Sequence, residues 1–107
     1  MEASKIDPIK SLIAYPNPFN DRVQISAQLN NESIGSMLQV DIYSVEGKWL
    51  KHFQENLNQT GVFTFNLEWD GKNMQGVNVN KGLFFIRMKV VSKEGKNFSK
   101  VLKIIKL

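Results

Sequence analysis

The chain has 107 residues, no cysteine, and ordinary shares of hydrophobic (42%) and charged (22%) residues. This length and composition suit one folded domain with its own core, and they exclude disulfides, thiolate metal sites and cysteine nucleophiles. The formal net charge of +4 is unevenly distributed, because residues 1–80 hold six basic and nine acidic side chains whereas residues 81–107 hold eight basic and one acidic. The excess positive charge therefore lies in the C-terminal quarter of the chain.

The N-terminal residues show no strand or helix period and include Pro8. We expect residues 1–11 to be a linker or flexible N-terminus and residues 12–107 to form the domain. The first residues also lack the apolar segment of a signal peptide. If the domain is exported, we expect it to travel as part of a larger precursor.

A proline-rich segment follows the short apolar stretch at residues 12–14. Its sequence is Tyr15-Pro16-Asn17-Pro18-Phe19. Each proline fixes its own φ and disfavours helical geometry in the residue before it. The segment is predicted to be a rigid corner that no helix can pass through.

The rest of the chain shows the alternation, or the dense β-branched and aromatic composition, that is typical of strands. These segments are residues 22–29, 38–43, 49–55, 63–69, 83–91 and 98–107. Turns containing Gly47 and Gly95 join two predicted hairpins, and the segment 83–91 is apolar enough on both faces to be central. The predicted fold class is all-β, a seven-stranded antiparallel immunoglobulin-like β-sandwich, with the strand order left open.

No constellation of residues predicts catalysis. His52 is the only histidine and lacks the partners of a catalytic triad or a metal site, so we expect it at the surface. Asp70 is predicted to form an Asx turn rather than a calcium loop. We expect no enzyme activity, no cofactor, no metal and no small-molecule substrate.

The basic C-terminal quarter leaves two interpretations open. Its lysines either protect an edge strand from aggregation or form a recognition surface. Nucleic-acid binding is not expected, because the alternation predicts that at least half of the nearby rings, those of Phe84, Phe85 and Phe98, are buried.

Four motifs occur in one order along residues 12–107. They are YPNPF at residues 15–19, VDIYSVEGK at 40–48, WDGKN at 69–73 with NKGLFF at 80–85, and the terminal SKVLKIIKL at 99–107. In this order they resemble the type A C-terminal sorting domain of the type IX secretion system (Por secretion system C-terminal domain), although Phe84 stands where that family more often has tyrosine. The WDG segment is also similar, more weakly, to the immunoglobulin-like domain of the flagellar hook-capping protein.

The resemblance implies a C-terminal secretion signal that follows an upstream cargo or catalytic domain in the same precursor. In that family the outer-membrane translocon recognises the domain after periplasmic transit, and a sortase usually removes it at the cell surface, or the protein is secreted. The alternative is a retained immunoglobulin-like structural, adhesive or assembly module of a cell-surface or secretion-apparatus protein.

The resemblance also implies roles for individual residues. The final strand and the turn before it are the parts tied to recognition, here Gly95, Lys96, Lys100, Val101, Lys103, Ile104, Ile105, Lys106 and Leu107. The structural motif residues are Tyr15, Pro16, Asn17, Pro18, Gly47 and Gly82. Cleavage is expected in the flexible segment before the sandwich, with Ala3, Ser4 and Lys5 as candidates.

Overall fold

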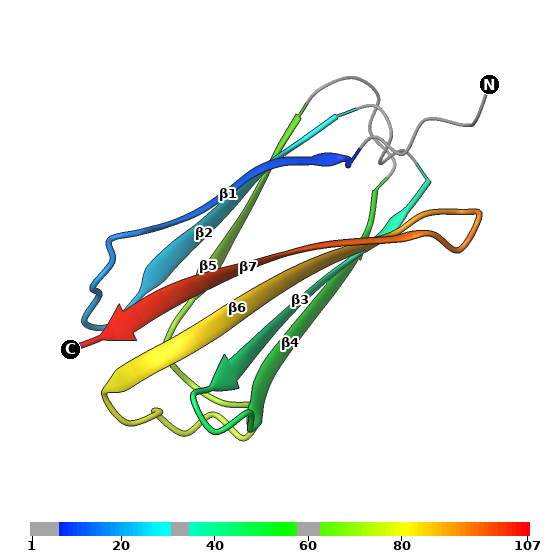
Figure 1. Cartoon of the computed structure of the whole chain (residues 1–107). Helices are drawn as coiled ribbons and strands as arrows, with labels where there is room; N and C mark the ends of the chain where they lie inside the picture. The colour runs from blue at the N-terminus through cyan, green and yellow to red at the C-terminus, as the bar shows by residue number, and fades with distance from the viewer. Residues whose placement is uncertain (1–6, 31–34, 58–62) are drawn as a thin grey trace.

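The alternating segments of the sequence do form strands. The structure, a computed structural model, describes residues 7–30, 35–57 and 63–107. Within these ranges there are seven strands (Figure 1): β1 (Ile9–Tyr15), β2 (Val23–Leu29), β3 (Met37–Ser44), β4 (Trp49–Asn56), β5 (Phe63–Trp69), β6 (Gly82–Val91) and β7 (Asn97–Lys106). None of the described residues belongs to a helix that is long and apolar enough to cross a membrane.

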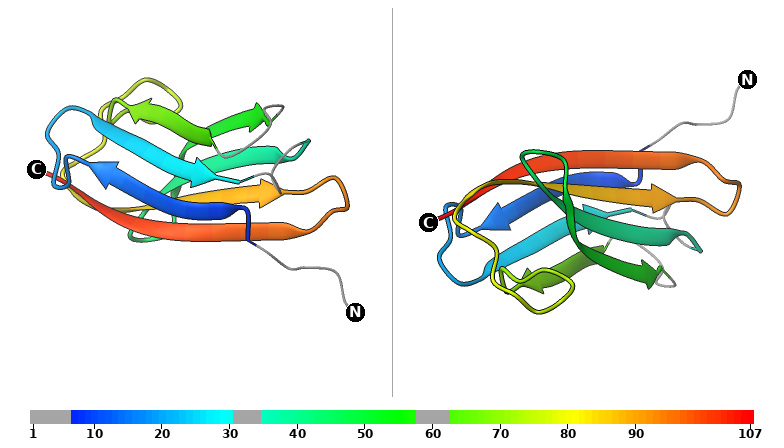
Figure 2. Two further views of the ribbon diagram at one scale, coloured as in Figure 1. Left: turned by 90° about the horizontal axis from the view of Figure 1, so that it is seen from above. Right: turned by 90° about the horizontal axis from the view of Figure 1, so that it is seen from below.

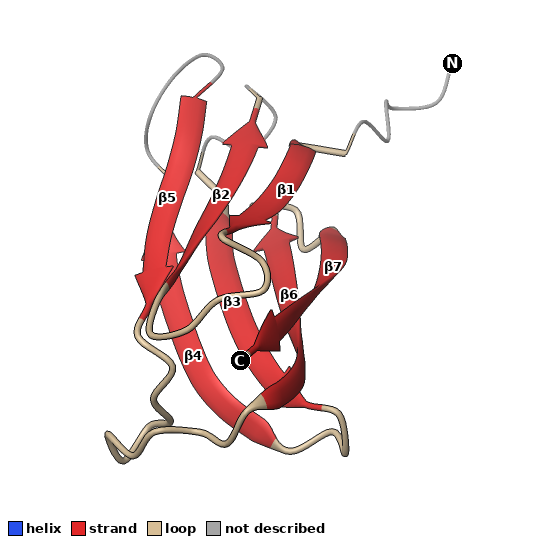
Figure 3. Cartoon of the chain, turned by 90° about the vertical axis from the view of Figure 1, so that its left-hand side faces the viewer, coloured by secondary structure: helices blue, strands red, loops and turns tan. Residues whose placement is uncertain are grey.

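The strands form two layers. One sheet has three strands in the order β1-β2-β5, and the other has four in the order β4-β3-β6-β7. All neighbouring strands are antiparallel, and the two sheets face each other across the core (Figure 3). The body is elongated, 48 × 22 × 22 Å. The predicted all-β sandwich is confirmed.

The core lies between the layers because successive side chains of a strand point to opposite faces. In β2 and β6 every second residue is buried, which gives each strand one fully apolar inner face. Removing this apolar surface from water is the main force that holds the layers together. The inner faces of these two strands are formed by Val23, Ile25, Ala27, Leu29, Phe84, Ile86, Met88 and Val90.

The position of β6 is the one predicted, between β3 and β7 within its sheet. Its outward residues are only half-buried, however. The strand is therefore central because it has a hydrogen-bonded neighbour on each side and a covered inner face, and no described layer covers its outer face. The β-rich composition of residues 83–91 could not distinguish a strand flanked by two others from a strand covered on both faces.

The first strand begins earlier than the expected boundary at residue 12. Ile9 is 2% exposed and pairs with Leu29, and the Asn30 N–H donates a hydrogen bond to the Pro8 carbonyl (3.1 Å). β1 is an edge strand of its sheet, where a proline at the start is tolerated. The structured domain therefore includes residues 9–11.

Candidate functional site

The terminal strand β7 lies at the edge of the four-stranded sheet. It pairs with β6 over its whole length, from Asn97 opposite Val91 to Lys106 opposite Gly82. Figure 1 shows it running along the length of the molecule to the C-terminus. One face of β7 packs into the sandwich, and the other faces outward.

The outward face of β7 is more apolar than its lysine content suggests. Val101 and Leu107 are each 61% exposed and Ile105 is 44% exposed, with the exposed Lys103 among them. Ile104, on the opposite face, is fully buried. We call the exposed set the outward row; it consists of Ser99, Val101, Lys103, Ile105 and Leu107.

The lysines of this region do not form one surface. Lys96 and Lys103 are exposed, whereas Lys100 and Lys106 belong to the inward-facing set and are half-buried. The Lys100 ammonium lies 3.8 Å from a carboxylate oxygen of Asp7. Lys106 lines a shallow hollow that contains two carboxylates, of Asp21 and Asp70, and two other basic side chains, of Arg22 and Lys72. Part of the positive charge therefore faces carboxylates of the same chain, and the C-terminal quarter is not a uniform basic edge.

The proline corner, residues 15–19, lies along the free edge of β7. The Phe19 N–H donates to the Ile105 carbonyl (2.9 Å), and the Leu107 N–H donates to the Phe19 carbonyl (2.8 Å). The Asn17 side chain adds two further hydrogen bonds, from its Nδ2 to the Lys103 carbonyl (3.0 Å) and from the Ile105 N–H to its Oδ1 (3.0 Å). The side-chain amide of Asn17 thus bonds to β7 as a main-chain peptide group of a neighbouring strand would.

This arrangement occupies both edges of the last part of β7. The main chain at residues 103–107 is bonded to β6 on one side and to the proline corner on the other. A further strand cannot pair with these groups unless the corner leaves. Only the side chains of the outward row are available there.

Buried aromatic rings fix the proline corner in place. Phe19 is 1% exposed, and its ring centroid lies 5.8 Å from that of Trp69, which in turn lies 5.8 Å from Phe84. The buried indole N–H of Trp69 donates to the Lys72 carbonyl (2.9 Å). The three rings come from two of the four sequence motifs and link the corner to the start of β6. The main chain of Phe19 adds the link to the terminal motif in β7.

The turn before β7 is far from the C-terminus. Gly95 is exposed with φ +85°, and the Ser92 hydroxyl and carbonyl accept hydrogen bonds from Lys96 and Gly95. Gly95 and Leu107 are separated by about 40 Å at the rise of an extended strand. The residues that the sequence predicts for recognition are thus spread along the whole length of β7 and do not form a compact patch.

The remaining predicted residues lie either at a turn or strand end or outside the described part of the chain. Gly47 (φ +87°) closes the β3–β4 hairpin in the same way as Gly95, and Gly82 (φ +143°) opens β6. Tyr15, at the end of β1, is half exposed. The expected cleavage candidates Ala3, Ser4 and Lys5 lie outside the described residues.

A polar cluster on the outer face of the four-stranded sheet was not predicted. Asp41 is 7% exposed and accepts hydrogen bonds from Trp49 Nε1 (2.9 Å) and from His52 Nδ1 (2.7 Å). The second nitrogen of His52 faces Gln54 Oε1 at 3.4 Å. The signal that could have predicted it is the register of the β3–β4 hairpin, which places Asp41 opposite His52. Both ring nitrogens face structural partners, so the arrangement orients a histidine without presenting it to a nucleophile.

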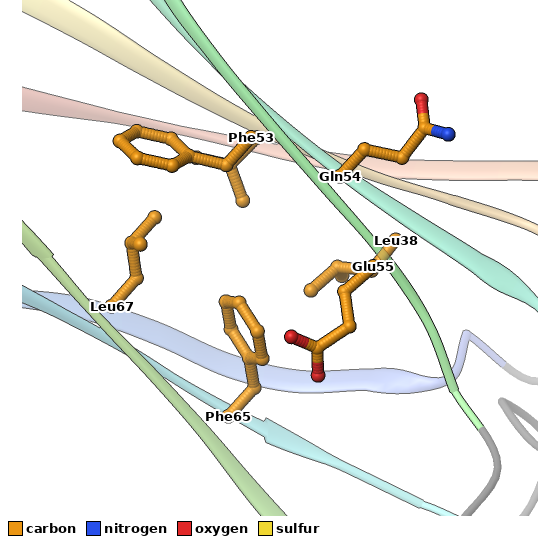
Figure 4. Close-up of a pocket in the computed structure, with 7 residues that line it drawn as sticks. Leu38, Phe53, Gln54, Glu55, Phe65 and Leu67 are labelled. Carbon is orange, nitrogen blue, oxygen red and sulfur yellow. The ribbon is translucent and has the colours of Figure 1, made fainter.

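The side of the sandwich between β4 and β5 contains a small cavity. It has a volume of about 150 Å³, and Figure 4 shows Phe53, Phe65 and Leu67 facing each other across it. Typical ligand sites are two or more times larger, roughly 300 to 1,000 Å³. We interpret it as an incompletely filled gap where two strand edges do not pair. Within the described ranges no three histidine or acidic side chains are close enough to hold a metal ion.

Solved structures with a similar fold come from several kinds of protein. Dimeric latent PorU from Porphyromonas gingivalis has a TM-score of 0.79 at 21% identity, covering 98% of this chain and 10% of that one. A family 76 glycoside hydrolase from a bovine Bacteroides thetaiotaomicron strain has a TM-score of 0.62 at 14% identity, with 94% and 20% covered. FlgD from Pseudomonas aeruginosa has a TM-score of 0.56 at 19% identity, with 96% and 78% covered. At these identities the likeness extends to the fold alone.

The sequence matches none of the curated proteins with which it was compared. The family model of the secretion system C-terminal sorting domain, in contrast, matches residues 13–106. That range includes the proline corner, the aromatic cluster and all of β7, the parts that the structure joins. The chain therefore belongs to the family of type IX secretion system C-terminal sorting domains.

Proposed function

We propose that this domain directs a larger exported precursor through the outer-membrane translocon of the type IX system, and that the translocon binds the outward row of β7. Family membership supports export to the cell surface or secretion. The single observation that supports this mode of binding is the double pairing of residues 103–107, which occupies their main chain and leaves Lys103, Ile105 and Leu107 exposed. Recognition then depends on side-chain contacts at a strand of fixed shape.

In this proposal the precursor first crosses the inner membrane by a signal peptide that precedes its cargo, and the domain folds in the periplasm. A sortase then removes the domain by cutting the segment before β1, with residues 3–5 as the candidates. A protease needs an extended, unpaired segment, and from Ile9 onward the main chain is paired with β2. Mass spectrometry of the mature surface protein tests this step, and a cargo that still carries β1 would contradict it.

Deleting residues 103–107 is a poor test of recognition, because it removes the fully buried Ile104 and the hydrogen bonds of the proline corner. Substitution of exposed residues avoids this problem. We suggest Ile105→Ser together with Leu107→Ser in a precursor that joins a signal peptide and a reporter enzyme to residues 1–107. Both side chains are largely exposed, so the domain should stay folded.

The expected result in a type IX-competent bacterium is that most of the reporter stays in the periplasm. Fractionation and protease treatment of intact cells measure this. The matched control is Ile13→Ser together with Val77→Ser, two apolar side chains that are 53% and 58% exposed and do not belong to β7; it should be delivered normally. Normal delivery of the β7 variant would instead favour a retained structural or adhesive module.

A further inference from the structure

A hollow on the outer face of the four-stranded sheet borders the outward row of β7. Its volume is about 300 Å³, and its side chains come from the end of β3, the turn after it, β6 and β7. Opposed residues of neighbouring strands share a face, and the register places Tyr43 beside Phe85 and Arg87 beside Val101. The lining is mostly apolar or aromatic: Tyr43, Ser44, Val45, Gly47, Phe85, Arg87 and Val101.

Arg87 is the one charged side chain of this lining. Its Nε is buried, and no described group accepts a hydrogen bond from it. The neighbouring carboxylate in register is Asp41, but its Oδ1 already accepts from Trp49 and His52, and no Asp41–Arg87 ion pair occurs among the described residues. A buried donor without an acceptor is costly. A guanidinium is suited to a carboxylate, which it can bind through two parallel hydrogen bonds.

The surroundings of the hollow favour a negatively charged partner. Lys103 lies opposite Phe85, and Lys89 follows two residues after Arg87 on the same face of β6. Val45 and Val101 are 57% and 61% exposed, so apolar surface remains available beside the charges. The partner must therefore supply both a carboxylate and apolar side chains.

We propose that this hollow binds a protein segment in which an aspartate or glutamate is flanked by apolar residues, with the carboxylate bound by Arg87. A protein segment fits better than an anionic lipid surface, because a lipid surface requires a broad basic face and the lysines of β7 are divided between its two faces. This inference rests on the proposed function, since the hollow borders the outward row. It adds the chemistry of the partner.

Titration of the whole chain with short peptides, followed by amide NMR, tests the inference. The probes are acetylated peptides with Val and Leu around a central Glu, and the same peptides with Gln or Lys in its place. We expect saturable shifts at Phe85, Arg87 and Val101 with the Glu series, and about tenfold weaker binding with Gln, the difference that one charge-assisted hydrogen bond makes. Arg87→Met should reduce Glu binding to the Gln level, and Arg87→Lys should restore only part of it.

The matched control is Arg22→Met, because Arg22 is exposed and paired with Glu68 on the other sheet; it should bind as the unmodified chain does. If Arg87→Met fails to fold, the affinities of the Glu and Gln peptides for the unmodified chain still show whether the hollow selects a carboxylate. Equal binding of the three series, shifts elsewhere, or no saturable shift would overturn the inference. Arg87-dependent binding to phosphatidylglycerol vesicles without peptide binding, or self-association through this face, would also overturn it.

The two proposals fail separately. If the Glu peptides do not bind but surface delivery still depends on Ile105 and Leu107, only the inference about the hollow is overturned. Peptide binding with normal delivery of the variant at those two positions would overturn only the proposed function.

Discussion

The two long sides of the sandwich are closed in different ways. On one side β7 lies beside β1 (Figure 2), and the proline corner bonds to its edge with four hydrogen bonds. On the other side, no hydrogen-bonded pairing joins β4 to β5 within the described residues, and side chains leave a gap of about 150 Å³. The beginning of the domain therefore holds its last strand, whereas the opposite side depends on packing alone.

The largest difference between the two sides should come from core aromatics. Phe19→Ala should lower the free energy of unfolding by about 3 to 5 kcal/mol, the usual cost of removing a buried ring. Phe65→Ala, which enlarges the gap beside β4, should cost about 1 to 2 kcal/mol, because that ring is only half-buried. Urea denaturation measures both values. Equal losses of unfolding free energy in the two variants would mean that the two sides contribute equally to stability.

The next effect isolates the hydrogen bonds of Asn17. Asn17→Ala should lower the free energy of unfolding by about 1 to 2 kcal/mol, and amide hydrogen exchange should become faster at Ile105, which loses its acceptor. Asn17→Asp keeps that acceptor and loses only the donor to Lys103, so its effect should be intermediate.

Asn73→Ala is the control for Asn17. The Asn73 side chain also accepts main-chain hydrogen bonds, from Gln75 and Val77, but it lies in the loop before β6. Its loss should leave exchange at Ile105 unchanged. Unchanged exchange in Asn17→Ala as well would show that the corner does not hold β7.

Much of the fold follows from local patterns that the sequence displays. The period-two alternation predicted the strands, and the short Glu-Gly turns predicted the hairpins. The predicted Asx turn at Asp70 is confirmed by its hydrogen bond from the Lys72 N–H (3.1 Å). These features depend on residues close together in the chain.

The parts that the sequence did not predict depend on distant partners. Asn17 lies 88 residues from Ile105, and no local pattern indicates that a rigid corner will bond to the last strand. In β7 the phase of the alternation was hidden, because Val101-Leu102 and Ile104-Ile105 each place an apolar residue on both faces. The lysines could not be assigned to a face until the phase was known.

The smallest effect concerns the charge on β7. The Lys100 ammonium is 3.8 Å from Asp7 and both side chains are about 40% exposed, so Lys100→Gln should change the free energy of unfolding by less than about 0.5 kcal/mol. Urea denaturation at low and high salt measures this, and a larger or strongly salt-dependent loss would mean that the ion pair helps to hold β7 beside β1. Because Lys100 contributes so little to stability, a loss of surface delivery in Lys100→Gln could be assigned to recognition. Normal delivery would instead restrict recognition to the outward row, since Lys100 faces the other side of the strand.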